Sequence, residues 1–124
     1  MCLILLAWQA HPDYPLVIAA NRDEFFARPA AAADFWQAAP QVLAGRDLQA
    51  GGTWLGVTRN GRFSALTNYR DPAQNHPLSS RGALVADFLT GNETPENYLA
   101  RIASSGVRYN GYNLLLGDGQ SLWW

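Results

Sequence analysis

Short apolar runs and polar turn segments alternate over the first part of the chain. Leu3–Gln9 is almost continuously apolar, which predicts a strand buried on both faces. Residues 11–15 include two prolines and an aspartate, a composition typical of turns. Leu16–Ala20 is a second apolar run, so residues 2–20 are predicted to form an antiparallel hairpin. The hairpin ends in the polar block Asn21–Glu24.

The middle of the chain contains many turn-forming residues. Arg28–Pro29 interrupts regular structure, and residues 30–33 are predicted to be a loop or a helical turn. Val42–Ala44 predicts a short strand. Thr53–Thr58 and Phe63–Asn68 predict a second hairpin, because the Asn-Gly dipeptide between them tolerates the positive φ angles of a tight turn.

Apolar residues at helical spacing mark two segments after the second hairpin. Ala83–Leu89 predicts one helix, with a serine of the pair 79–80 as its N-cap and Gly91 as its stop. A second helix is predicted to begin with Pro95 in its first position. Its apolar stripe consists of Tyr98, Leu99, Ile102 and Ala103.

Two strands are predicted after the helices, at Asn113–Gly117 and from Leu122 to Trp124. Adjacent hairpins with the helices grouped together indicate an α+β layered fold. The sequence stops at two tryptophans within an apolar strand. We therefore expect residues 1–124 to be one domain truncated at its C-terminus, or one that assembles with another copy or chain.

Composition and charge narrow the class of protein. Of the 124 residues, 48% are hydrophobic, and the formal net charge is −1, which argues against a protein that binds nucleic-acid phosphates. All nine cationic side chains are arginines, which excludes Schiff-base chemistry by lysine. No apolar run is long enough to cross a membrane, and the N-terminal run lacks the basic flank of a signal peptide. A cytoplasmic location is expected.

Cys2 is the first candidate for chemistry. A small residue after Met1 favours removal of the methionine, which would give Cys2 a free α-amine that titrates near neutral pH. A thiol beside such an amine is an activated nucleophile. With Met1 retained, Cys2 is instead an ordinary small residue at the head of a strand. One cysteine and two histidines do not make a metal cage, so no metal or cofactor is expected.

The polar block after the first hairpin allows two interpretations. As a strand-end turn, it would hold an exposed ion pair between Arg22 and Asp23 or Glu24. Alternatively, the hairpin would bring the block beside Cys2, where a carboxylate could hold the terminal amine. The pattern of residues leaves both interpretations open.

Eight short motifs follow one another over nearly the whole chain: Met1–Cys2, Asn21–Glu24, Arg28–Pro29, Ala44–Asp47, Gly51–Gly56, Leu66–Tyr69, Ser80–Gly82 and Tyr112–Leu115. This ordered set resembles the NRDE family, also called the transport and Golgi organisation 2 family. Members of that family are considerably longer than this chain. The resemblance therefore implies the N-terminal part of such a protein.

That family is in turn similar to the N-terminal-nucleophile hydrolases of the choloylglycine hydrolase and penicillin V acylase branch. The resemblance implies an αββα sandwich and a cysteine amidohydrolase that cleaves a C–N bond of a small amide or related acyl substrate. Cys2 would be the nucleophile, Asp23 and Asn21 would orient its amine, and the Tyr69 N–H would help to form the oxyanion hole. Ala20 stands where the branch has an arginine. The residues expected to brace the site or contact substrate are Arg22, Glu24, Arg46 and Asn68.

The same fold admits a non-catalytic alternative, in which the protein handles or transports haem or an acyl ligand. Cys2 with His11 or His76 would then be the axial ligands of the iron. This alternative predicts a retained Met1 and ligand binding that survives loss of the thiol. A third hypothesis is a half-domain that forms a homo-oligomer or pairs with another chain.

Overall fold

The hairpin predicted at the N-terminus is present, and it forms a sheet of its own. The computed structural model describes residues 2–69 and 79–124. In it, β1 (Leu3–Trp8) pairs antiparallel with β2 (Leu16–Asn21) as a two-stranded sheet. The prediction that the first strand is buried on both faces is wrong, since Leu3 and Leu5 are 52% and 60% exposed. The physical reason is that no second layer of the described residues covers the hairpin.

The other described strands form one antiparallel sheet in the order of the sequence. Its strands are β3 (Ala30–Trp36), β4 (Ala39–Asp47), β5 (Leu55–Thr58), β6 (Phe63–Asn68), β7 (Tyr112–Gly117) and β8 (Leu122–Trp123). The turn predicted between β5 and β6 is confirmed, and Gly61 provides its positive φ of 85°. The two strands predicted after the helices are confirmed as β7 and β8.

The edge of this sheet differs from the prediction. Residues 30–33 are not a loop or a helical turn, because they belong to β3 and pair with β4. Alanine has little intrinsic strand preference, so the tertiary pairing decides the outcome here. Similarly, the strand predicted at Val42–Ala44 is longer in the structure, because β4 is hydrogen-bonded to β3 on one side and to β5 on the other.

Two helices lie between β6 and β7 in the described sequence: α1 (Gly82–Thr90) and α2 (Pro95–Ser104). The prediction for the start of α2 is confirmed, since Pro95 occupies the first turn and the Thr94 side chain accepts a hydrogen bond from the Asn97 N–H. The serine N-cap predicted for α1 is wrong. Arg81 is the N-cap residue and makes no side-chain capping bond, because Ser79 pairs with the segment around Tyr109 instead.

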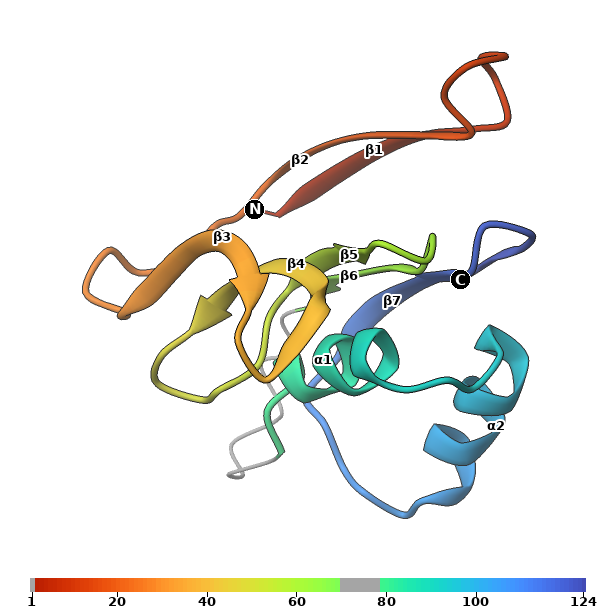
Figure 1. Cartoon of the computed structure of the whole chain (residues 1–124). Helices are drawn as coiled ribbons and strands as arrows, with labels where there is room; N and C mark the ends of the chain where they lie inside the picture. Colours follow the sequence, from red (N-terminus) through yellow and green to blue (C-terminus); the bar gives the residue numbers. More distant parts are fainter. Residues whose placement is uncertain (1, 70–78) are drawn as a thin grey trace.

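The core lies between α1 and the six-stranded sheet. Leu84, Val85, Phe88 and Leu89 of α1 are buried there against β4, β5 and β6. Figure 1 shows the helices on one side of this sheet and the β1–β2 hairpin on the other. The fold is thus a mixed α+β fold with antiparallel sheets, as predicted.

A close backbone contact fixes where α1 begins. A Cβ atom added to Gly52 would lie 2.4 Å from the carbonyl carbon of Gly82. The Thr53 N–H also donates a hydrogen bond to the Gly82 carbonyl at 3.2 Å. Because both glycines lack a side chain, the loop before β5 lies directly against the first residue of α1. This contact places Arg81, one residue earlier, beside that loop.

Candidate functional site

The register of the β1–β2 hairpin brings Cys2 to the polar block. Leu3 pairs with Asn21, so the residue before Leu3 faces the residues after Asn21. The Asp23 N–H donates a hydrogen bond to the Cys2 Sγ at 3.3 Å, and this Sγ lies 3.9 Å from the Asp23 carbonyl oxygen. The prediction that the hairpin brings the block beside the half-buried Cys2 is therefore confirmed.

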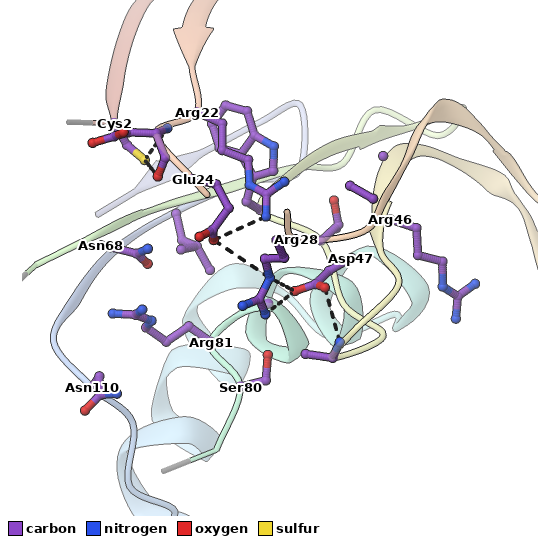
Figure 2. Close-up of a pocket in the computed structure, with 18 of the residues that line it drawn as sticks. Cys2, Arg22, Glu24, Arg28, Arg46, Asp47, Asn68, Ser80, Arg81 and Asn110 are labelled. Atoms are coloured by element: carbon purple, nitrogen blue, oxygen red, sulfur yellow. Dashed lines mark hydrogen bonds and ion pairs between the residues drawn. The ribbon is translucent and has the colours of Figure 1, made fainter. Parts of the chain in front are cut away.

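Cys2 lines a cavity of about 420 Å³. The cavity walls come from the segment after β2, from β3 and β4, from the loop before β5, from β6 and from the start of α1 (Figure 2). Its lining is mostly polar and carries both signs of charge. The charged lining residues are Arg22, Asp23, Glu24, Arg28, Arg46, Asp47 and Arg81.

Four of these side chains alternate in charge along one wall. The Arg28 guanidinium contacts the Asp47 carboxylate through its Nη2 at 2.6 Å and its Nε at 3.0 Å. Glu24 Oε2 lies 3.8 Å from the Arg28 Nε and 3.4 Å from the Arg22 Nη2. Figure 2 shows Arg28 between the two carboxylates. Arg22 and Arg28 are therefore both neutralised by carboxylates of the cavity.

Asp47 is the best-anchored of these groups. Partial burial raises the pKa of its carboxyl, but the Arg28 hydrogen bond and the N–H groups of Ala50 and Gln49 outweigh that effect and hold the pKa below its ordinary value. The same contact with Asp47 raises the pKa of Arg28. The pair thus ties the segment after β2 to the end of β4.

Arg81 differs from the other cations that point into the cavity. Its Nη1 donates a hydrogen bond to the Gly111 carbonyl at 3.0 Å. Within residues 2–69 and 79–124, no carboxylate oxygen lies within 4.0 Å of the Arg81 guanidinium, the limit for an ion pair. Partial burial lowers the pKa of Arg81, although Glu24 acts in the opposite direction. Figure 2 shows its guanidinium directed to the side of the cavity where Asn68 and Asn110 lie.

The cavity collects most, though not all, of the residues expected from the sequence. Its lining includes Cys2, Asp23, Arg22, Glu24, Arg46 and Asn68. Asn21 and Tyr69 are outside the lining. The Tyr69 N–H donates a hydrogen bond to the Gly111 carbonyl at 2.9 Å, so in this structure the N–H is already bonded to the backbone. Arg46 stacks on Trp36, with 4.7 Å between its Cζ and the ring centroid, and points away from Cys2 (Figure 2).

The sequence alone assigns no function to several residues that line the cavity. Arg28 and Asp47 stand in recognised motifs, and opposite charges in two motifs could have suggested a pair. For Arg81, the sequence indicates only a position at a helix start. Asn110 has no signal in the sequence, yet its Oδ1 is buried and accepts no hydrogen bond from the described residues.

Of the predicted axial ligands for haem, Cys2 and His11 do not come together. His11 lies in the loop at the far end of the hairpin from Cys2, with the six paired positions of β1 between them. Six residues of strand span about 20 Å, too far for the two side chains to share one iron. His76 lies outside the described residues. The described part of the chain also holds no group of three or more histidine, cysteine or acidic side chains that could bind a metal.

None of the described helices has the length and apolar character needed to cross a bilayer.

Comparison with known proteins gives a consistent picture. The sequence model of the family described as "Transport and Golgi organisation 2" matches residues 1–124. The Transport and Golgi organization protein 2 homolog of Bos taurus is 45% identical over 95% of this chain, and that of Homo sapiens is 41% identical over 95%. The Drosophila melanogaster protein is 33% identical over 93%. In each case the match covers 45% of the relative, so the chain spans about half the length of the curated relatives it matches. The chain belongs to the Transport and Golgi organisation 2 family.

Proposed function

We propose that this chain carries the nucleophile of an N-terminal-nucleophile amidohydrolase, and that Cys2 attacks the carbonyl carbon of a small amide or related acyl substrate. The observation that carries the proposal is the position of the Cys2 Sγ, in a polar cavity and 3.3 Å from the Asp23 N–H that donates to it. A backbone donor directed at sulfur stabilises negative charge that develops there. The cavity of about 420 Å³ has the size of a small-molecule site.

The proposed reaction begins after removal of Met1. The free α-amine of Cys2 takes the proton of the thiol, the sulfur bonds to the substrate carbonyl carbon, and the C–N bond breaks as the amine returns the proton to the leaving nitrogen. Water then hydrolyses the thioester and restores Cys2. Asp23 and Asn21 would hold and orient the amine, because both flank Cys2 across the hairpin register.

Stabilisation of the oxyanion is a separate requirement of this chemistry. The Tyr69 N–H can serve only if it exchanges the Gly111 carbonyl for the substrate oxygen. The Asn68 side chain lines the cavity and is a second candidate donor. The αββα sandwich belongs to the same proposal. The described residues would supply one helical layer, the six-stranded sheet and the first hairpin of its other sheet.

A covalent intermediate tests this function most specifically. The protein is incubated with a panel of small amides and thioesters, and its intact mass is measured over time. We expect a transient gain equal to the acyl group, together with release of the leaving group, and neither in the Cys2→Ala variant. Cleavage that continues in Cys2→Ala, or absence of any adduct from the protein lacking Met1, would contradict the proposal.

A non-catalytic role in handling an acyl ligand or haem is the second candidate. It is favoured by the exposed apolar side chains near the cavity and along the hairpin, namely Leu3, Leu5, Val17, Phe25 and Phe26. The names of the relatives also include the word transport. Titration with a fatty-acyl ligand and with haemin distinguishes this role, because saturable binding should be unchanged in Cys2→Ala.

The location proposed for either role is the cytoplasm. A reducing compartment keeps a lone thiol such as Cys2 free of disulfides. Oxidation of most of the purified cellular protein at Cys2 would argue against this location.

A further inference from the structure

The cations of the cavity are unequally compensated. Arg22 and Arg28 lie against Glu24 and Asp47, and Arg46 stacks on an aromatic ring outside the centre of the cavity. Arg81 has only a neutral partner among the described residues, the carbonyl of Gly111. Among residues 2–69 and 79–124, no carboxylate lies within ion-pair distance of this guanidinium, so its positive charge can be offered to a ligand.

Burial makes this uncompensated charge significant. Arg81 is half-buried, and partial loss of water disfavours its charged form. An incompletely hydrated guanidinium gains most from an anion that supplies both charge and hydrogen bonds. Because one side of the guanidinium is held by Gly111, its orientation is fixed before a ligand arrives.

The neighbouring groups suit a small anion. Asn68 and Asn110 line the same cavity, and each side chain carries an amide donor. The planar fork of arginine matches the two oxygens of a carboxylate. A phosphate would bring more negative charge than one uncompensated arginine neutralises, so a carboxylate fits the balance of charge better.

We propose that Arg81 is the anion-binding residue of the Cys2 site, and that the ligand taken there is a small acyl compound bearing a carboxylate. The substrate class rests on the proposed function, whereas the binding of the anion does not require catalysis. Arg81 would hold the carboxylate while the reacting carbonyl lies toward Cys2. Cys2 and Arg81 both line this cavity.

Two alkylating reagents of nearly equal size provide the test. Cys2 is the single cysteine of the chain, so alkylation by iodoacetate or iodoacetamide reports on this site alone. We expect the ratio of the iodoacetate rate to the iodoacetamide rate to fall at least about tenfold in Arg81→Gln and to be partly retained in Arg81→Lys. Added salt should reduce the wild-type ratio. Arg101→Gln is the matched control, because Arg101 of α2 is exposed and paired with Glu93, which precedes the helix. An unchanged ratio in Arg81→Gln would overturn the proposal.

If the thiol proves unreactive, an equilibrium binding measurement tests the anion site without any reaction at Cys2. Calorimetry on Cys2→Ser compares succinamate with its neutral analogue succinamide. We expect succinamate to bind at least about tenfold more tightly and to lose this advantage in Arg81→Gln. Equal binding of the two compounds would refute the anion site. If Arg81 dependence is found and no amide is cleaved, the hydrolase proposal falls and the anion site remains. Cys2-dependent cleavage without Arg81 dependence would refute the anion site and leave the hydrolase proposal in place.

Discussion

The Asp23 N–H donates to the Cys2 Sγ at 3.3 Å, although the two residues are 21 positions apart in the chain. The β1–β2 register creates this contact, because Asn21 is the last residue paired across the hairpin and faces Leu3. The thiol is therefore held at the point where the chain leaves the hairpin and enters the polar block.

Hydrogen exchange tests this contact directly. In Cys2→Ala, the Asp23 amide should exchange about 2- to 12-fold faster than in the wild type, the range that corresponds to loss of one hydrogen bond of about 0.5–1.5 kcal/mol. The measurement is residue-resolved exchange by NMR. The Tyr69 amide, bonded to Gly111, is the internal control and should not change. Equal exchange of the Asp23 amide in both proteins would contradict the contact.

The Arg28–Asp47 pair should make stability depend on pH in acid. The folded pKa of Asp47 lies below its ordinary value, so the unfolded chain binds the proton more readily. The stabilisation is therefore complete above the unfolded pKa of about 3.9 and is lost as pH falls through the folded pKa. Asp47→Asn should lower the free energy of unfolding at pH 7 by about 1–3 kcal/mol.

Urea unfolding at several pH values checks this expectation. Asp47→Asn should show a weaker loss of stability below pH 4 than the wild type. Asp34→Asn is the control, because Asp34 is exposed and lies outside the cavity. Parallel acid profiles for the wild type and Asp47→Asn would show that the pair has no role in the folded state.

The contact between Gly52 and Gly82 should be intolerant of any side chain. A Cβ on Gly52 would lie 2.4 Å from backbone atoms of Gly82, which cannot rotate away. Gly52→Ala should lower the free energy of unfolding by about 1–3 kcal/mol, as overpacked sites do. Gly117→Ala is the matched control, since its nearest contact would be 3.4 Å. Denaturant unfolding that ranks the two variants equally would be inconsistent with the close approach.

Tyr98 should limit stability in alkali. Its ring is buried against Phe88, and its hydroxyl donates to the Leu84 carbonyl at 2.7 Å. Burial raises the pKa of Tyr98 well above that of a free tyrosine. The unfolded chain therefore loses the proton first, and stability falls as pH rises above about 10. Tyr98→Phe should lose about 0.5–1.5 kcal/mol at pH 7. Thermal unfolding between pH 7 and 11 should show a smaller alkaline decline in this variant than in the wild type.

Local patterns predict the parts of the fold that local chemistry decides. The first hairpin, the Asn-Gly turn at Gly61 and the Thr94 cap all depend on residues close in sequence. The prediction for residues 30–33 is wrong because pairing with β4, rather than the preference of alanine, makes them a strand. The serine cap fails for a similar reason, since Ser79 pairs with the segment around Tyr109.

In the candidate site, too, some residues can be placed from local patterns and others cannot. Cys2 and the block 21–24 can be placed together from the hairpin alone, and the structure confirms that they meet. Arg28 and Asp47 meet only through the course of the chain between β2 and the end of β4. The position of Arg81 depends on the contact between Gly52 and Gly82, which no periodic pattern in the sequence predicts. Side chains that converge through long-range contacts are therefore the ones to which the sequence alone assigns no role.

The intact mass of the protein tests most directly whether Cys2 is an activated N-terminal nucleophile. The mass is measured before and after a short pulse of iodoacetamide at mildly acidic pH. We predict loss of Met1 and rapid addition of a single label, which Cys2→Ala abolishes. Retained Met1 with slow labelling would show a blocked, ordinary thiol and would contradict the claim.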